Sequence, residues 1–523
     1  MHTTRRQFLT QVGLGAAGLG LAGCQFLRPA GSGPLPRSTP EAAGVSSAGI
    51  LAFLAAAVQA KIELHGFMLA RHGRVIAEGW WQPYGPQFNH TLYSLSKSFT
   101  STAVGFAVAE GRLAVNDKVI KFFPDELPAV VGENLAALRV RDLLSMSVGS
   151  AKEPTHDMVK EENWVRSFLA APIAHTPGST FMYNSGATYM CSAIVQKLTS
   201  QRILDYLTPR LFEPLGIYGA TWEVCPRGIN TGGWGLSVPT EALAKFGQLY
   251  LQKGVWQGRQ LLPAAWIEEA TTRKIQQSAP AKPARPNEQN DWLQGYGYQF
   301  WRCLHNAYRG DGAFGQFMVV MPEQDAVVTI NAEAGNMQSE LDLVWDHLLP
   351  ALHTQPLPPD AANCARLQHT LSTLALPLAG TARPEVALHP TGRKVFKLDA
   401  NSLGLESVAF DFRRGDCAVT FGAAQTERRL LAGYGSWQRG EIAVPGLPPR
   451  LISGGAPKPG TPAKVAASAA WQDANTLEVL LRYYETPHHD TLTCRFAGDT
   501  VKIELRASIG GNPRPVLRGK PMG

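Results

Sequence analysis

The chain has 523 residues, of which 45% are hydrophobic and 17% are charged, and its formal net charge is +7. This composition excludes a disordered chain, and the length is sufficient for two domains. The lysines and arginines are scattered and form no basic stripe with interleaved aromatic residues, so we expect no nucleic-acid partner.

The N-terminus has the features of an export signal. Arg5 and Arg6 precede an apolar, glycine-rich run, "VGLGAAGLGLAG", which is too short and too weak to remain as a membrane-spanning helix. The run ends in "LAGC", which resembles the lipoprotein box of bacteria and makes Cys24 the lipid-bearing residue. We predict a twin-arginine-type lipoprotein signal peptide over 1–23, a flexible tether over 24–42 and a periplasmic, membrane-anchored protein. An ordinary signal peptide, in which Cys24 is incidental, is the alternative.

Six further cysteines are dispersed along the chain. No CxxC pair or Cys/His cluster is present, so the sequence predicts no metal site and no cofactor. Cys417 and Cys494 lie in the same C-terminal region, where an exported protein can form a disulfide. Buried free thiols are the alternative for this pair.

Periodicity predicts a first domain of mixed α and β structure over residues 43–353. Two strands are expected in "GFMLARHGRVIAEGWW", and a helix is expected from Ser96 to Glu110 because apolar residues recur three or four apart. Further helices are predicted near "VRDLLSMS", "SGATYMCSAIVQKLT" and "PTEALAKFGQLYLQKG". Two more strands frame the Gly-rich turn "GDGAFGQF", and a final helix ends near His353.

The pattern changes after the first domain. Pro-rich residues and a short helical piece predict a linker over 354–393. From 394 to 523, alternating segments such as "SVAFDFRR" and "TVKIELRAS" are separated by Gly, Asp, Asn and Pro turns. This spacing predicts a separate antiparallel β-domain, with packing support as its default role. His488 and His489 fall at a turn of this domain, where we expect them to be solvent-exposed.

The segment "TLYSLSKSFTS" contains a candidate nucleophile with a candidate base. Ser94 precedes Lys97 by three residues at the start of the predicted helix, so the two side chains share a face. A partly buried lysine has a lowered pKa and can accept the proton of the serine hydroxyl. The positive potential of the helix N-terminus also favours an oxyanion near the Ser94 N–H group.

A second polar group occurs in "FMYNSGATYM", just ahead of another predicted helix. A tyrosine beside a lysine can share proton transfer, which makes Tyr183 a candidate. Ser185 can bond to Lys97 or to a substrate. On residue type alone, a tyrosine in this position is more often structural.

In combination, Ser94-x-x-Lys97, Tyr183-Asn184-Ser185 and "GDGAFGQF" resemble the serine-reactive β-lactamase and penicillin-binding-protein superfamily. The chain looks closest to the branch with class C β-lactamases, family VIII esterases and 6-aminohexanoate-dimer hydrolases. The resemblance covers about residues 41–353. It implies a β-lactamase/transpeptidase-like α+β or α/β fold, with an antiparallel sheet flanked by helices and an all-helical subdomain. The C-terminal antiparallel β-domain is additional.

The resemblance also implies residue roles. Ser94 stands as the nucleophile that forms an acyl-enzyme, and Lys97 with Tyr183 as the general base. Ser185 stands where many relatives have Asn. The family's third element, Lys-Thr-Gly or a His-x-Gly version, falls on Gly310-Asp311-Gly312, where neither Gly310 nor Asp311 carries the expected cation.

The missing cation bears on the substrate. Arg309 is the only cationic residue next to this motif. On a strand its side chain points to the same face as that of Asp311 and to the opposite face from Gly310. In relatives the cation helps bind a substrate carboxylate, so its loss favours neutral esters or amides over β-lactams and D-Ala-D-Ala peptides. We expect the strand edge near Ala313 or Phe314 to supply an oxyanion N–H group.

One aromatic residue and several histidines remain. Trp234, in "GGWGL", either forms a wall of the substrate pocket or packs in the core. The unclustered histidines, which this scheme does not need as bases, are expected to be structural: His72, His90, His175 and His305.

The sequence therefore predicts an exported serine hydrolase that acts on small-molecule or peptide esters or amides without a cofactor. A D-aminopeptidase, a D,D-peptidase or a β-lactamase acting on cell-wall-like substrates is the alternative within this chemistry. A non-catalytic envelope binding protein that retains the fold is the alternative of another class. The sequence does not indicate an oligomeric state.

Overall fold

The computed structural model describes residues 33–380, 391–423, 426–444, 447–449, 451–452, 462–510 and 514–522. The predicted signal peptide, Cys24 and the first part of the tether lie outside these residues, so export and lipid attachment stay predictions. Within the described part of the chain, none of the helices combines the length and the apolar character needed to cross a membrane.

The N-terminal domain is built on a six-stranded antiparallel sheet with the order β2-β1-β11-β10-β9-β8. Its strands are β1 (Glu63–Arg71), β2 (Arg74–Trp80), β8 (Trp301–Arg302), β9 (Tyr308–Gly312), β10 (Gln316–Met321) and β11 (Ala326–Glu333). The register aligns Phe67, Ile330 and Phe317 in one buried row. Neighbouring residues Met68 and Met318 face the opposite side and are buried too. Both faces are thus covered, which explains the continuous apolar runs of these strands.

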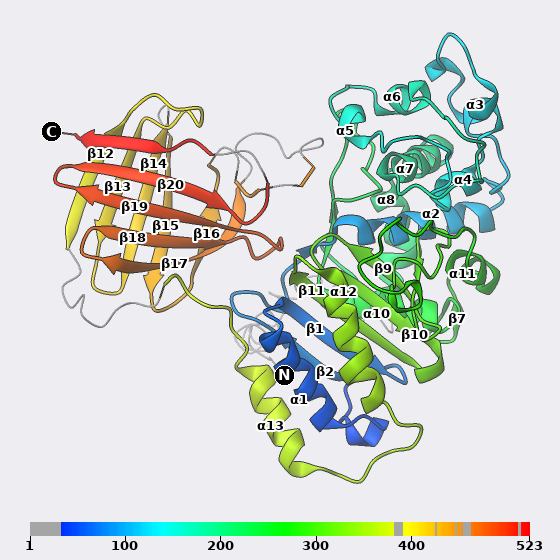
Figure 1. Cartoon of the computed structure of the whole chain (residues 1–523), viewed down its shortest axis with the longest axis horizontal. Helices are drawn as coiled ribbons and strands as arrows, with labels where there is room; N and C mark the ends of the chain where they lie inside the picture. The colour runs from blue at the N-terminus through cyan, green and yellow to red at the C-terminus, as the bar shows by residue number, and fades with distance from the viewer. Residues whose placement is uncertain are drawn as a thin grey trace, which may run out of the picture.

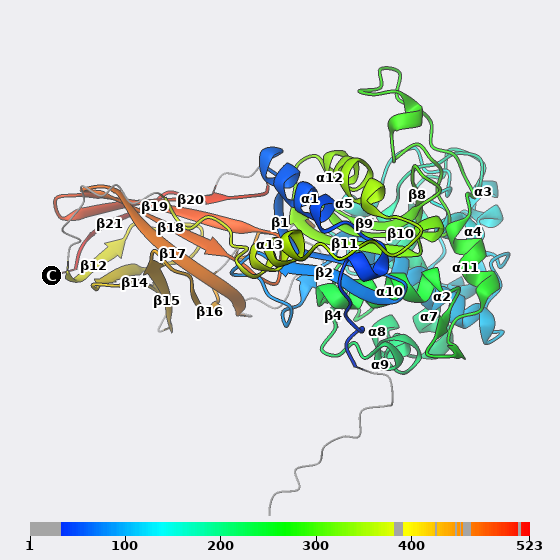
Figure 2. The ribbon, with the colours of Figure 1, turned by 90° about the horizontal axis from the view of Figure 1, so that it is seen from below.

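Helices cover the two faces of this sheet (Figure 1, Figure 2). On one side, α1 (Ser47–Gln59) packs with α12 (Met337–Leu343) and the π-helical turn Val344–Leu348. On the other side, α10 (Thr240–Leu251) lies against β1, β10 and β11. This arrangement confirms the predicted fold class of an antiparallel sheet flanked by helices.

A helical region packs beyond α10. Its helices are α2 (Ser96–Ala109), α3 (Glu133–Ala137), α4 (Val140–Leu144), α5 (Thr155–Met158), α6 (Trp164–Ala170), α7 (Ser185–Thr199), α8 (Ile203–Leu207), α9 (Glu213–Leu215) and α11 (Ala264–Thr271). The short strands are β3 (His90–Thr91), β4 (Thr221–Trp222), β5 (Leu236–Val238), β6 (Val255–Trp256) and β7 (Arg259–Gln260). Short helical turns are η1 (Glu41–Ala43), η2 (Tyr93–Leu95), η3 (Val119–Phe122), η4 (Pro124–Glu126), Thr208–Phe212, η6 (Asn287–Gln289), η7 (Pro322–Gln324) and Leu349–Ala351.

Helix α2 is buried on almost every side, from Ser96 to Ala107. Several of its hydroxyl side chains find partners in neighbouring elements, as most buried polar groups do. Thr100 donates to the Gly232 carbonyl at 2.8 Å, and Ser98 donates to the Gln299 carbonyl at 2.8 Å. The helix that carries the Ser-x-x-Lys motif is therefore fixed by polar contacts on several sides.

Two segments predicted as tether and linker belong to the N-terminal domain. The tether prediction for 24–42 is wrong for its last part, because Leu35 is buried and Arg37 binds Glu78 and Glu241 at 2.8 and 2.9 Å. The short helix predicted in the linker is α13 (Ala361–Ser372), which packs against α1 and β2.

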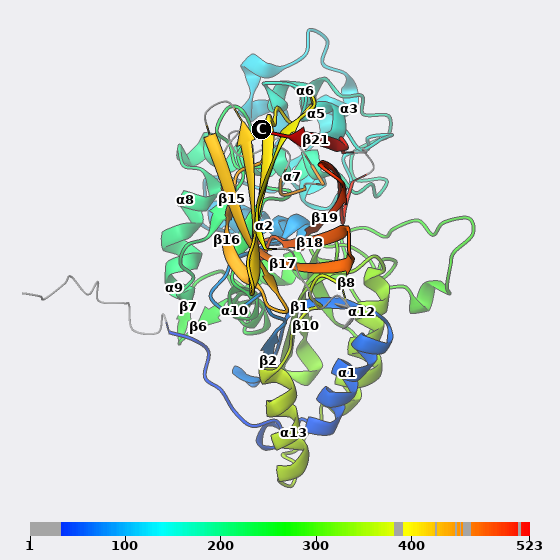
Figure 3. The same ribbon diagram turned by 90° about the vertical axis from the view of Figure 1, so that its left-hand side faces the viewer.

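The C-terminal domain is a ten-stranded β-barrel. Its strands are β12 (Gly392–Leu398), β13 (Ser407–Phe412), β14 (Asp416–Ala423), β15 (Thr426–Tyr434), β16 (Gln438–Ile442), β17 (Ala463–Asp473), β18 (Thr476–Arg482), β19 (His489–Ala497), β20 (Thr500–Ala507) and β21 (Leu517–Pro521). The order β15-β14-β13-β12-β21-β20-β19-β18-β17-β16 closes through a β15–β17 pairing (Figure 3). Cys417 and Cys494 are free thiols in its core, so of the two alternatives left open by the sequence the structure shows buried free thiols.

The end of β18 and the segment between β18 and β19 dock the barrel on the N-terminal domain. Tyr84 donates from its hydroxyl to the Thr486 carbonyl at 2.9 Å, and Arg482 binds Glu63 through Nη2 and Oε2 at 2.9 Å. The predicted exposure of the two histidines is wrong: His488 is fully buried and His489 is half-buried, because this turn faces the other domain.

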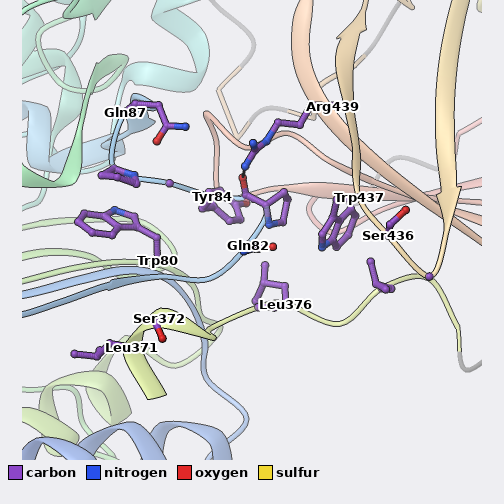
Figure 4. Close-up of a pocket in the computed structure, with 16 residues that line it drawn as sticks. Trp80, Gln82, Tyr84, Gln87, Leu371, Ser372, Leu376, Ser436, Trp437 and Arg439 are labelled. Carbon is purple, nitrogen blue, oxygen red and sulfur yellow. Dashed lines mark hydrogen bonds between the residues drawn. The ribbon is translucent and has the colours of Figure 1, made fainter. Parts of the chain in front are cut away.

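A cavity of about 870 Å³ lies along the same domain junction (Figure 4). Trp80 and Tyr84 line it from the N-terminal domain, Leu376 from the segment after α13, and Trp437 and Arg439 from the barrel. Arg439 donates to the Pro83 carbonyl at 2.9 Å and so ties the barrel to this part of the junction.

The ion pair between Glu63 and Arg482 should contribute strongly to stability. Burial acts to raise the pKa of Glu63, but hydrogen bonds and charge from His65 and Arg482 outweigh it and lower the pKa to about 2. Glu63→Gln leaves the buried guanidinium without this counter-charge, so we expect a loss of about 3 kcal/mol in the free energy of unfolding at pH 7. Urea denaturation measures this loss.

The pH dependence of unfolding gives a second readout. The stabilisation by Glu63 should be complete above its ordinary pKa of 4.5 and vanish as the pH falls towards 2. The exposed Arg495–Glu504 pair supplies a control, and Glu504→Gln should leave the urea midpoint unchanged. Equal midpoints for Glu63→Gln and the wild type would contradict the account.

Candidate active site

Ser94 lies in the short turn η2, between strand β3 and helix α2. The flanking Leu92 and Leu95 are fully buried and hold the turn in the core, while Ser94 is half-buried. Leu92 donates its N–H to the Leu236 carbonyl at 2.9 Å, which fixes the turn to β5. Tyr93 has a φ of 48°, in the left-handed region, so this turn is conformationally strained.

Lys97 lies one helical turn after Ser94, with its ammonium buried. Lys97 Nζ donates to Ser94 Oγ at 3.0 Å, to Ser185 Oγ at 3.1 Å and to the Gly233 carbonyl at 2.7 Å. The side chain is 1% exposed. Burial lowers its pKa to about 7, against the opposing effect of the negative charges of Glu153 and Asp311. A large fraction of Lys97 is therefore neutral near pH 7 and able to accept a proton.

Tyr183 approaches the same hydroxyl from the segment before α7. Its ring stacks on Trp301 with centroids 5.6 Å apart, and Lys97 Nζ lies 4.8 Å from the ring centroid. Its hydroxyl interacts with the Ser94 hydroxyl, an interaction that acts to lower the pKa of Tyr183. Burial raises the pKa of Tyr183 far above its ordinary value, and the nearby Asp311 adds to this effect. Tyr183 thus stays a neutral phenol that can donate and relay a proton.

The predicted residues Ser94, Lys97, Tyr183 and Ser185 thus meet at one point. Ser185 is the first residue of α7, whose N-cap Asn184 accepts from the Ala187 N–H at 2.9 Å. The cap sets where the helix begins and so directs Ser185 toward Lys97. A serine hydroxyl between a largely neutral amine and a phenol is equipped for nucleophilic attack on a carbonyl carbon.

Two further residues act at this point and were missed from the sequence. The Gly233 carbonyl accepts from Lys97, and Glu153 Oε1 accepts from the Ser185 N–H at 2.9 Å. Gly233 lies in the "GGWGL" segment, but every residue has a backbone carbonyl, so the sequence does not indicate which of them accepts from Lys97. Glu153 is an exposed residue of the loop before α5, and its spacing gave no indication of this contact.

Strand β9 brings the Gly310-Asp311-Gly312 motif against the turn that carries Ser94. A β-carbon at Gly310 would lie 2.7 Å from Ser98 Oγ, and one at Gly312 would lie 2.0 Å from the Leu92 carbonyl oxygen. Only glycine permits this approach at Gly312, because the opposing atom belongs to the backbone. The start of the β9–β10 turn, at Ala313, follows directly.

Arg309 and Asp311 form a buried ion pair beside the site. Arg309 Nε binds Asp311 Oδ2 at 2.9 Å, and the residues are 0% and 7% exposed. This geometry confirms that both side chains lie on one face of β9. The guanidinium also stacks over Trp292, 4.5 Å from its centroid, and donates to the Asp291 carbonyl. Arg309 is thereby neutralised and directed away from Gly310.

Trp234 is a core residue at the edge of the site. It is 3% exposed, and its ring stacks on Trp164 at 5.8 Å. It also borders a small pocket of about 40 Å³, together with Thr91, Tyr93 and Glu223. Core packing is therefore its main role, with one edge close to the residue before Ser94.

One group of potential metal ligands occurs among the described residues. Atoms of Glu63, Glu333 and His489 lie within 4.8 Å of one another at the domain junction. The two carboxylates already accept hydrogen bonds from Arg482 and His488, so protein donors occupy them. The group lies outside the arrangement around Ser94.

Comparison with known proteins adds a family match and relatives. The model of the β-lactamase family matches residues 54–348, more than half of the chain. The 6-aminohexanoate-dimer hydrolase of Paenarthrobacter ureafaciens is 26% identical over 285 residues, which are 50% of this chain and 70% of that protein. Protein flp of Staphylococcus aureus (strain MW2) is 27% identical over 144 residues, 26% of this chain and 29% of that protein.

A solved structure shows the same fold. The "Putative 6-aminohexanoate-dimer hydrolase from Bacillus anthracis" superposes with a TM-score of 0.50 and 18% identity. The match covers 64% of this chain and 90% of that chain.

Proposed function

This chain belongs to the β-lactamase family, and from that premise we propose that it is a serine hydrolase that cleaves neutral ester or amide bonds through an acyl-enzyme on Ser94. The observation that carries the proposal is the buried Lys97 amine, 3.0 Å from Ser94 Oγ and with a pKa of about 7. A base with a pKa near the working pH is the most effective partner for a serine hydroxyl.

Acylation follows from this geometry. Neutral Lys97 takes the proton of Ser94 Oγ as the oxygen attacks the substrate carbonyl carbon. Tyr183, which interacts with Ser94 and stays protonated, passes a proton to the departing alcohol or amine. The bond to the leaving group breaks, and Lys97 returns the proton that Tyr183 has given up.

Hydrolysis of the acyl-enzyme uses the same groups in reverse. A water molecule attacks the ester carbonyl, loses a proton to the Lys97–Tyr183 pair and takes the place of Ser94 Oγ. The proton then returns to Ser94 as the acid product leaves. Each tetrahedral intermediate carries a negatively charged oxygen. We assign the N–H groups of Ser94 and Ala313 as the hydrogen-bond donors that stabilise this oxygen.

The charges around the site support the proposed preference for neutral substrates. Arg309 is neutralised by Asp311, and Glu153 adds a negative charge near Lys97. A substrate carboxylate would meet no free cation on β9 and a net negative field. The 6-aminohexanoate-dimer hydrolase relative is consistent with the hydrolysis of a small-molecule amide.

The pH dependence of turnover tests the role of Lys97. Below pH 7 the amine is protonated and cannot accept the serine proton, so kcat/KM for p-nitrophenyl butyrate should rise with pH and level off above an apparent pKa of about 7. Lys97→Met should lower kcat/KM by about a thousandfold. Lys245 is a matched control, since it is another buried lysine with a lowered pKa, and Lys245→Met should keep the pH profile. Full activity of Lys97→Met would refute the assignment.

Substrate charge tests the proposed preference. The butyrate ester and the hemisuccinate ester of p-nitrophenol have acyl chains of the same length and differ by a terminal carboxylate. We expect kcat/KM to be about tenfold or more lower for the hemisuccinate, with a smaller difference at high salt. We also expect slow hydrolysis of the β-lactam nitrocefin. Equal rates for the two esters, or rapid nitrocefin turnover, would show that the argument from Arg309 and Asp311 is wrong.

A further inference from the structure

The barrel reaches the segment that carries Ser94. The turn between β18 and β19 lies against β3, where the Thr91 N–H donates to the Glu485 carbonyl at 2.9 Å. Thr91 also donates to this carbonyl from its hydroxyl, at 3.2 Å. The C-terminal domain is therefore bound to the chain three residues before the proposed nucleophile.

His488 continues this contact as a fully buried side chain. Its Nδ1 lies 2.8 Å from Glu333 Oε1, and its Nε2 lies 2.5 Å from the Tyr93 hydroxyl. A carboxylate only accepts hydrogen bonds, so Nδ1 is the donor to Glu333, and in this tautomer Nε2 accepts from the Tyr93 hydroxyl. Glu333, at the end of β11, also accepts from His489 and Ser508 and is thus held in place.

The strained backbone conformation of Tyr93 depends on contacts that fix its side chain. Its φ of 48° is unfavourable for an aromatic residue, and such a conformation persists only where the surroundings fix the side chain. Because Tyr93 precedes Ser94 directly, a change in its backbone conformation moves Ser94 Oγ relative to Lys97.

The same histidine ring contacts the other side of the site. Phe314, in the β9–β10 turn, packs edge-on against His488 at 4.8 Å and against Tyr93 at 5.5 Å. Phe314 also has a positive φ, of 68°. The ring therefore packs between two strained residues, one beside Ser94 and one beside Ala313, whose N–H we assign to the oxyanion.

We propose that His488 of the C-terminal barrel is a positioning residue for the reaction at Ser94, acting through the Tyr93 hydroxyl and anchored by Glu333. This inference rests on the proposed acylation of Ser94. It makes the barrel a functional part of the site, because His488, which contacts the Tyr93 hydroxyl, belongs to the barrel.

Single-turnover acylation by p-nitrophenyl butyrate tests the proposal in the full-length protein. Tyr93→Phe keeps the ring and removes only the hydroxyl. We expect the maximal acylation rate to fall about tenfold, with the half-saturating substrate concentration changed less than twofold, since displacement of a reacting group lowers the rate more than binding.

Two substitutions at His488 separate its two hydrogen bonds. The amide of His488→Asn reaches the position of Nδ1 and keeps the hydrogen bond to Glu333, but it is too short to keep the hydrogen bond with the Tyr93 hydroxyl. The amide of His488→Gln reaches the position of Nε2 and can still accept from Tyr93. We expect His488→Asn to match Tyr93→Phe, His488→Gln to recover most of the rate, and the Tyr93→Phe/His488→Asn double variant to be no slower than either single variant.

Tyr84→Phe is the control, because it removes a hydrogen bond to the same turn, at the Thr486 carbonyl, without touching Tyr93. Its acylation rate should stay within twofold of the wild type. Equal rates for Tyr84→Phe, Tyr93→Phe and His488→Asn would overturn the positioning role while leaving the proposed function intact. If the wild type itself forms no acyl-enzyme on Ser94, both proposals fail.

Discussion

The burial of one ammonium group constrains the architecture around the site. Lys97 is 1% exposed, and a buried charge without partners is costly, so its environment must supply acceptors and favour the neutral form. The acceptors come from three elements: Ser94 in η2, Ser185 at the start of α7 and the Gly233 carbonyl between β4 and β5. The packing of α2 against α7 and against this turn is therefore also what lowers the pKa of the amine.

The parts of the site that the sequence could predict are local in the chain. Ser94 and Lys97 share a helix face because they are three residues apart, and the strands and helices of the first domain follow from their apolar periodicity. Tyr183 was a candidate by residue type, and the family resemblance supplied its role beside Lys97, since nothing in its own segment indicates Lys97. Glu153 lies in an exposed loop, and its hydrogen bond to Ser185 depends on tertiary structure that no spacing encodes.

The domain junction was the least predictable feature. A histidine in a turn between two strands is usually exposed, yet the turn after β18 is covered by the N-terminal domain, and His488 is buried against Glu333 and Tyr93. Leu35 was misjudged for the same reason, because composition alone does not show which surface covers a Pro-rich segment. Away from the junction, the sequence did predict that Arg309 and Asp311 share a face of their strand, because side chains two residues apart on a strand point the same way.

The most direct test of the central claim is the intact mass of the protein after rapid mixing with p-nitrophenyl butyrate and acid quenching, followed by peptide mapping. The account predicts one butyryl group, located on the peptide at Ser94, and no added mass on the Ser94→Ala variant. Release of p-nitrophenol without a butyryl group at Ser94, or with the group on another residue, would contradict the account.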